Sequence, residues 1–224
     1  MRRVIALALT FLAAIASPVM AQGIVYEEVF EEVIEAPASG QRFVAAQPAP
    51  VPQGIASYGP FRVLDGARAA LVDVTDERSP AQFTAMLAAY PGITMLEMID
   101  SPGTEDDRAN LALGRMIHAR GMSTHVPAGG SVRSGGVELF LAGVRRSAHP
   151  QAEFAVHAWA DEDGRQPQDY AVNAPENRAY VDYYKAMGMT APQAAAFYAM
   201  TNSVPHEDAK WLTATDMRQW VRLD

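Results

Sequence analysis

Short β-type runs alternate with helical patterns from Ser57 onward, and this alternation limits the fold more than any other feature of the chain. A hairpin is predicted around the Asp65-Gly66 turn, followed by a helix over 79–92, a buried strand over 93–99 and a helix over 104–121. Further predicted elements are strands at 122–127 and 152–159, a helix at 134–146, and helices at 177–188, 190–201 and 213–221. Such alternation predicts a single α/β domain over residues 57–224.

The N-terminal segment is typical of an export signal. Residues 1–21 contain Arg2 and Arg3, then an apolar run, then small residues before Ala21, which predicts a signal peptide cleaved after Ala21 and a periplasmic location. The alternative is an uncleaved anchor, but the run is shorter than the ~20 residues of a membrane span, and no later segment is apolar enough to cross a bilayer. Residues 22–56, first acidic and then rich in Ala and Pro, are predicted to be weakly ordered.

Composition excludes several functional classes. The 224 residues include no cysteine, so disulfides, a thiolate nucleophile and sulfur metal sites are excluded. Loss of the signal peptide would lower the basic residues from 18 to 16 against 26 acidic ones, a net charge of −10, which disfavours nucleic acid and anionic membranes as partners. Asp106 and Asp107 are adjacent on a helix and face different ways, and no H-x-H or H-x-x-x-H pair occurs, so no metal is expected. Acyl transfer by a serine would need no cofactor.

Ser134, in the stretch GGSVRSGGVELFLAG, has two interpretations. It can cap the helix that begins at Gly135, because serine is a favoured N-cap. It can also be a nucleophile, since an exposed serine at a helix start has the N–H of Gly135 beside it to stabilise an oxyanion. Val132 excludes a G-x-S-x-G elbow, and Ser131 is a competing serine.

Two further stretches could complete a site with Ser134. His157 is in an apolar strand, where an imidazole either is a satisfied core residue or lines a cleft. The stretch IDSPGT, residues 99–104, joins a strand to a helix, so its N–H groups either bind an anion or form a tight turn capped by Ser101 or Thr104.

The order of these three stretches resembles the Clp protease proteolytic subunit and the wider ClpP/crotonase superfamily. In that family a strand ends in S-P-G-G, a later strand leads to the nucleophile serine and a helix, and the next strand carries the histidine. The resemblance covers about residues 61–223 and implies a spiral of β-β-α units, and it allows a homo-oligomer.

The resemblance also implies roles for individual residues. Ser134 would be the nucleophile and His157 the general base, with an oxyanion hole formed by the N–H of Gly135 and that of Gly103 or Thr104. The acid would be Asp208, with Glu207 or His206 as substitutes. All three could equally be capping or solvated groups.

The chain departs from the family pattern at three positions: Thr104 replaces the second glycine, Arg133 precedes the serine, and Trp159 replaces a proline. The sequence therefore leaves two functions open. One is a periplasmic serine hydrolase, a peptidase that acts on peptides or unfolded protein segments without an ATPase partner, because that compartment lacks ATP. The other is a catalytically silent module that binds a partner. Acyl-CoA chemistry is disfavoured by export, because coenzyme A is a cytoplasmic carrier.

Overall fold

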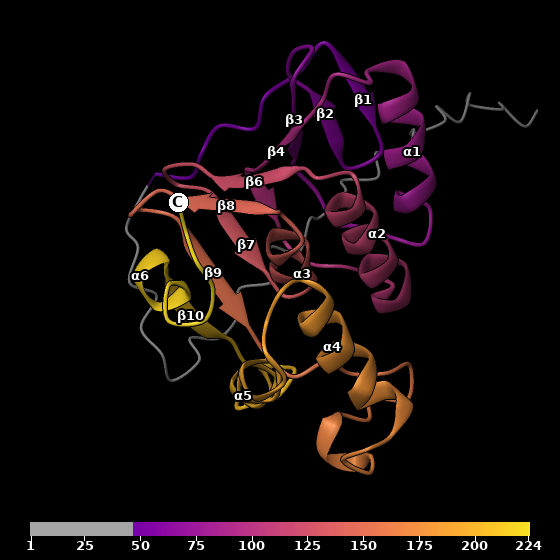
Figure 1. Cartoon of the computed structure of the whole chain (residues 1–224), viewed down its shortest axis with the longest axis vertical. Helices are drawn as coiled ribbons and strands as arrows, with labels where there is room; N and C mark the ends of the chain where they lie inside the picture. Colours follow the sequence, from indigo (N-terminus) through magenta and orange to yellow (C-terminus); the bar gives the residue numbers. More distant parts are fainter. Residues whose placement is uncertain (1–46) are drawn as a thin grey trace, which may run out of the picture. The chain divides into compact units, whose positions relative to one another are not determined.

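The computed structural model describes residues 47–224 (Figure 1). The predicted signal peptide and most of the predicted weakly ordered segment lie outside these residues. The strands are β1 Ala56–Tyr58, β2 Phe61–Val63, β3 Arg68–Leu71, β4 Met95–Met98, β5 Asp100–Ser101, β6 Ser123–Val126, β7 Ser131–Arg133, β8 Arg145–Ala148, β9 Glu153–Val156 and β10 Lys210–Thr213. The helices are α1 Ser79–Ala89, α2 Asp107–Ala119, α3 Gly135–Leu141, α4 Pro175–Ala186, α5 Ala191–Thr201 and α6 Ala214–Met217, with a short 3-10 helix at Pro167–Asp169.

The chain distributes its strands between two sheets in a regular sequence. One sheet has six strands, in the order β1-β2-β3-β4-β6-β8, and the other has four, in the order β10-β9-β7-β5. In each of the consecutive pairs β4–β5, β6–β7 and β8–β9, the first strand belongs to the six-stranded sheet and the second to the four-stranded sheet. Helices α2 and α3 follow the first two pairs. The strands of successive pairs are parallel within each sheet. This is the predicted α/β spiral of β-β-α units.

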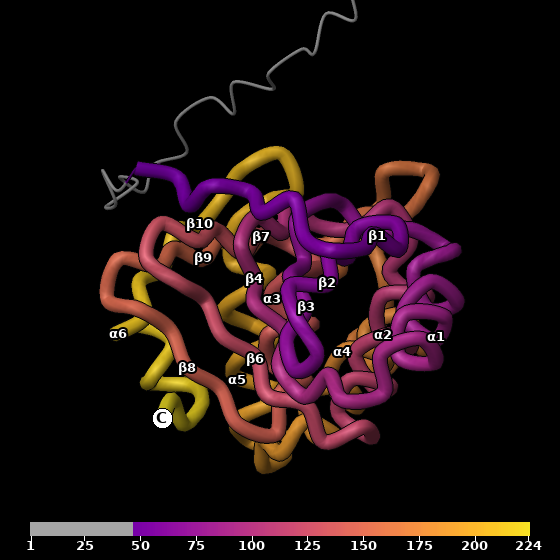
Figure 2. Tube along the Cα trace, turned by 90° about the horizontal axis from the view of Figure 1, so that it is seen from above, coloured from indigo at the N-terminus to yellow at the C-terminus, as the bar shows by residue number. Residues whose placement is uncertain are grey.

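The helices surround these sheets. Helix α2 packs against α1, α3 and α4, and α4 packs against α5. Figure 2 shows α1 and α2 on one side of the strands and α6 on the other. The core between them is largely apolar, with Phe140 of α3 against Phe154 of β9 at a ring-centroid distance of 5.0 Å.

Local sequence signals explain several elements. The predicted hairpin is confirmed, because β2 and β3 pair antiparallel across the turn at Asp65, whose carboxylate accepts the N–H of Ala67. Ser79 is the first residue of α1, and its hydroxyl donates to Asp76. Helix α2 is capped by Asp106, which accepts the N–H of Ala109, and not by Ser101 or Thr104.

The prediction of one helix over 134–146 is wrong at its end. Helix α3 stops at Leu141, and Arg145–Ala148 forms β8, which pairs with β6. Gly143 stands at the crowded transition, where an added Cβ would lie 2.8 Å from the carbonyl oxygen of Arg145. The β8 residues Arg-Arg-Ser-Ala have no apolar alternation, so tertiary pairing rather than local pattern makes them a strand.

Candidate active site

The four-stranded sheet brings three predicted site residues to one edge. Strands β5, β7 and β9 are parallel neighbours, and Gly103, Ser134 and His157 each follow the end of one of them by one or two positions. The backbone N–H of Ser134 donates to the carbonyl of Ala155, 2.9 Å away, which ties it to β9. In open sheets of this kind, ligands bind beyond the carboxyl ends of the strands.

Ser134 has an unusual backbone conformation. Its φ of 48° and ψ of −129° make it the one non-glycine residue with positive φ in the described part of the chain. A residue held in this region costs about 1–3 kcal/mol, and such strain is concentrated at functional sites. Ser134 occupies the N-cap position of α3, but its hydroxyl makes no capping hydrogen bond. The position of the predicted cap is therefore confirmed, whereas its side chain is not used for capping.

Gly103 lies directly against Ser134. Its φ is 141°, and a Cβ at this position would come within 3.1 Å of the Ser134 Cβ and 3.5 Å of its Oγ. Gly135 is the first residue of α3, so its N–H has no acceptor within the helix. The Ser134 hydroxyl thus stands between a bare glycine backbone and a helix N-terminus, an arrangement suited to stabilising an oxyanion.

Thr104 packs against the helix start. Its Cγ2 is 2.7 Å from the position that a Cβ on Gly135 would take, so only glycine fits there. Its hydroxyl is 3.2 Å from the carbonyl oxygens of both Thr75 and Asp106. The departure from glycine at position 104 is therefore accommodated by contacts to α3 and to the backbone.

A buried amide network fixes this region, and sequence reasoning missed it. Asn110 of α2 donates to the carbonyl of Gly135 at 2.7 Å, and the Thr75 hydroxyl donates to Asn110 Oδ1 at 3.0 Å. The same Thr75 hydroxyl oxygen is also 3.3 Å from the carbonyl oxygen of Gly103. Asn110 and Thr75 are 2% and 0% exposed. The network links the Gly103 segment to the start of α3 and so fixes their spacing.

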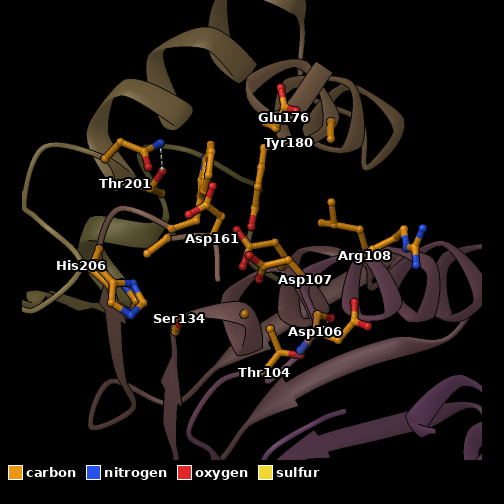
Figure 3. Close-up of a pocket in the computed structure, with 18 of the residues that line it drawn as sticks. Thr104, Asp106, Asp107, Arg108, Ser134, Asp161, Glu176, Tyr180, Thr201 and His206 are labelled. Atoms are coloured by element: carbon orange, nitrogen blue, oxygen red, sulfur yellow. Dashed lines mark hydrogen bonds between the residues drawn. The ribbon is translucent and has the colours of Figure 1, made fainter. Parts of the chain in front are cut away.

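Two histidines share one backbone carbonyl. His157 Nδ1 is 2.8 Å and His206 Nδ1 is 3.0 Å from the carbonyl oxygen of Ala158, and their rings meet edge to face at 4.7 Å. A carbonyl only accepts hydrogen bonds, so Nδ1 carries the proton and Nε2 is the basic nitrogen of each neutral ring. Figure 3 shows His206 and Ser134 at the same end of the cavity.

The predicted acid is elsewhere. Asp208 does not line the cavity that contains Ser134 and His157, and its backbone N–H donates to the Pro205 carbonyl at 3.1 Å. Glu207 faces Gln166 at 3.4 Å. Of the predicted acid and its substitutes, the structure brings His206 alone to the cavity lining. The carbonyl of Ala158 holds Nδ1, the nitrogen that the acid of a catalytic triad normally binds.

Ser131 and Arg133 belong to a different group. Arg133 Nη1 donates to Ser131 Oγ at 2.7 Å, and the Ser131 hydroxyl donates to Glu153 Oε1 at 2.7 Å. Arg133 Nη2 is also 3.1 Å from Asp100 Oδ1. This polar ladder runs across β5, β7 and β9 and does not line the cavity. It accounts for the arginine that precedes Ser134 and separates the competing serine from the site.

The cavity measures about 1020 Å³. Of the predicted site residues, Thr104, Ser134, Gly135 and His157 line it, and Gly103 lies next to Ser134. Two carboxylates missed by sequence reasoning, Asp107 and Glu138, line it as well. Among residues 47–224, no three His, Asp or Glu side chains are grouped as a metal site requires.

Asp107 and Glu138 are held in an environment that favours their protonated forms. Burial raises the pKa of Asp107, while a hydrogen bond from Tyr180 and the charges of His157 and His206 lower it. Figure 3 shows the Tyr180 side chain pointing toward Asp107. Burial raises the pKa of Glu138 from 4.5 to about 7, against the effect of the Tyr184 hydroxyl, which donates to Oε1 at 2.6 Å. Glu138 is 7% exposed.

Glu138 predicts a pH-dependent stability. Between pH 4.5 and about 7 the folded chain holds a proton on Glu138 that the unfolded chain has released. The contribution of this group to the free energy of unfolding is therefore full below pH 4.5 and falls as the pH rises to 7, by on the order of 3 kcal/mol. Urea unfolding of wild type and Glu138→Gln at pH 5 and pH 8 tests this. The wild type should lose stability relative to the variant as the pH rises, and parallel pH profiles would show that Glu138 titrates normally.

No helix in the described part of the chain combines the length and the apolar character that a bilayer crossing needs. No protein-family model matches the chain, and no curated protein does. Solved structures do match, at low sequence identity. A mutant of ClpP1 from Listeria monocytogenes is 17% identical over 70% of this chain and 88% of that one, with a TM-score of 0.46. A mutant of the 1510-N membrane-bound stomatin-specific protease, in complex with a substrate peptide, is 16% identical over 66% and 70%, with a TM-score of 0.42.

An enoyl-CoA hydratase from Shewanella pealeana is 13% identical over 73% of this chain and 66% of that one, with a TM-score of 0.46. The matches include Clp proteases, a stomatin-specific protease and an enoyl-CoA hydratase. The strand order of this chain is that of the predicted β-β-α spiral.

Proposed function

We propose that this chain is a serine hydrolase that acts on peptides, with Ser134 as the nucleophile. One observation carries the proposal. Ser134 is held at φ 48° and ψ −129° at the start of α3, with a hydroxyl that caps nothing and with Gly103 against it. A purely structural serine would gain nothing from this strained conformation, because it makes no capping bond to offset its cost.

The reaction is acyl transfer. Ser134 Oγ attacks the carbonyl carbon of the substrate while His157 Nε2 takes the hydroxyl proton, and the backbone N–H of Gly135 with that of Gly103 or Thr104 stabilises the anionic oxygen. His157 then returns the proton to the leaving amine, and the C–N bond breaks. Water attacks the acyl-enzyme by the same route and regenerates Ser134.

The orientation of His157 is assigned to the Ala158 carbonyl rather than to Asp208. The carbonyl holds Nδ1 at 2.8 Å, which sets the tautomer that a general base at Nε2 needs. His206, bound to the same carbonyl, is the neighbouring imidazole that can share or replace this role.

The proposal places the mature chain in the periplasm, exported by residues 1–21. Its substrates there are peptides or unfolded protein segments that arrive without an ATPase partner, and the active form can be a homo-oligomer.

Labelling with a fluorophosphonate probe tests the nucleophile. Wild type should be labelled at one serine, and Ser134→Ala should lose the label completely because the probe reacts only with an activated hydroxyl. Ser203→Ala, at an exposed serine, is the matched control and should label normally. Label that persists in Ser134→Ala and disappears in Ser131→Ala would show that Ser131, and not Ser134, is the nucleophile.

One observation favours the second candidate, a non-catalytic binding module. Thr104 places a side chain beside Gly135, where a substrate carbonyl would approach. In that case, wild type would bind peptides in the cavity but would take up no fluorophosphonate.

A further inference from the structure

The inner wall of the cavity carries a buried acid close to the nucleophile. Glu138 follows Ser134 by four residues on α3, one helical turn and about 6 Å along the axis. Both residues line the same cavity. The Glu138 carboxyl group accepts the Tyr184 hydroxyl, and no cation is bonded to it among the described residues. The charged form of a carboxyl group this deep is costly unless a positive charge is brought to it, and otherwise the group takes up a proton.

The cavity lining as a whole is strongly acidic. It includes eight carboxylates and three arginines. Arg165 is already paired with Asp161 and Asp163, and Arg115 lies over the Tyr183 ring at 5.4 Å. The third, Arg108, is exposed. The carboxylates are those of Glu105, Asp106, Asp107, Glu138, Asp161, Glu162, Asp163 and Glu176.

Aromatic rings form another wall of the cavity. Trp159 and Tyr180 are stacked, with ring centroids 6.2 Å apart and planes 6° from parallel, and the Trp159 indole N–H donates to the Tyr198 hydroxyl at 2.8 Å. Tyr184 lies next to Tyr180 and carries the hydroxyl that reaches Glu138. Aromatic faces beside carboxylates are the surroundings in which proteins bind ammonium and guanidinium groups.

A buried acceptor in the same cavity also lacks a donor. Asn202 Oδ1 is inaccessible to solvent and receives no hydrogen bond from the described residues. Asn202 Nδ2 donates to the Tyr198 carbonyl at 2.7 Å. Thr201, beside it in sequence, lines the same cavity as Tyr184 and Glu138. Unsatisfied buried acceptors are rare in folded proteins, so this oxygen adds to the polar character of the wall.

We propose that this cavity binds a cationic side chain of the substrate, a lysine or an arginine on the acyl side of the scissile bond, with Glu138 as its principal partner and Asp107 as the second. This proposal rests on the proposed hydrolase function. The distance of one helical turn from Ser134 to Glu138 suits a long side chain whose backbone carbonyl lies at the nucleophile. The aromatic wall covers its methylene stem, and the carboxylates neutralise its charged end.

Calorimetric titration of the Ser134→Ala protein tests recognition without turnover. The probes are two acetylated tetrapeptide amides, Ala-Ala-Lys-Ala and the same peptide with norleucine for lysine, which removes the charge and keeps the stem. The lysine peptide should bind at least about tenfold more tightly, the effect of a charged hydrogen bond. Equal affinities, or tighter binding of the norleucine peptide, would overturn the proposal.

Second-site variants locate the preference. Adding Glu138→Gln should reduce the affinity ratio to less than about threefold, and Asp107→Asn should reduce it in part. Glu176→Gln, at an exposed carboxylate of the rim, should change it less than about twofold because exposed charges are screened. A ratio that survives both Glu138→Gln and Asp107→Asn would overturn the assignment, and Asp107→Asn alone decides it if Glu138→Gln does not fold. Failure of fluorophosphonate labelling would count against the hydrolase, yet the affinity ratio would still be measurable.

Discussion

Ser134→Ala and Ser134→Gly should both lower the turnover of an acyl substrate such as p-nitrophenyl acetate by at least about 10³-fold, the scale of losing a serine nucleophile. The two variants should differ in stability. Alanine keeps the strain of φ 48°, whereas glycine adopts positive φ at no steric cost. The entropy of the unfolded chain lowers the free energy of unfolding of the glycine variant by up to about 1 kcal/mol. The strain in the alanine variant is larger, so the glycine variant should be the more stable of the two by about 1 kcal/mol.

Urea unfolding measures this difference, with the same pair of substitutions at Ser203 as the control. Ser203 has an ordinary negative φ, so there the glycine variant should be the less stable of the two. If the Ser134 pair shows the same order as the Ser203 pair, the conformation at Ser134 stores no strain. The main support for its assignment as the nucleophile would then be lost.

The parts of the fold that could be predicted are those with local signals. Apolar runs and helix-stop residues identified β4, β6 and β9 and the helices α1, α2, α4 and α5, and their alternation predicted the α/β class. Strands β5 and β7 have two and three residues and β8 is polar, so no periodicity could develop in them. They are strands because neighbouring strands supply their hydrogen bonds.

The site divides in the same way. Gly103, Ser134 and His157 are at strand ends, where small and polar residues in an apolar context stand out in the sequence. Glu138 is different, because a glutamate in the first turn of a helix usually stabilises the helix dipole in solvent. It is buried because α4 covers it and supplies Tyr184. The orienting carbonyl of Ala158 has no sequence signal at all, since every residue has one.

Gly114→Ala should destabilise the protein by about 3 kcal/mol, although alanine at an ordinary helix position is favoured over glycine by about 1 kcal/mol. A Cβ on Gly114 would lie 2.8 Å from Tyr183 Cζ and closer still to the hydroxyl oxygen. Tyr183 is fully buried and donates to the Glu138 carbonyl at 2.6 Å, so it cannot move aside without losing packing and that hydrogen bond.

A double-mutant cycle with Tyr183→Phe isolates this cause. Phenylalanine removes the hydroxyl that meets the new Cβ, so Gly114→Ala should cost at least about 1 kcal/mol less in the Tyr183→Phe background than in wild type, a coupling expected for residues in direct contact. If the losses in free energy of unfolding, measured by urea unfolding, are additive for the two substitutions, the Tyr183 hydroxyl is not the reason that position 114 needs glycine. Non-additive losses would establish that α4 packs closely against α2 because position 114 has no side chain. That packing holds Tyr183 on the Glu138 carbonyl and the neighbouring Tyr184 on the Glu138 carboxyl group, so the cavity wall beside Ser134 depends on a residue outside the cavity.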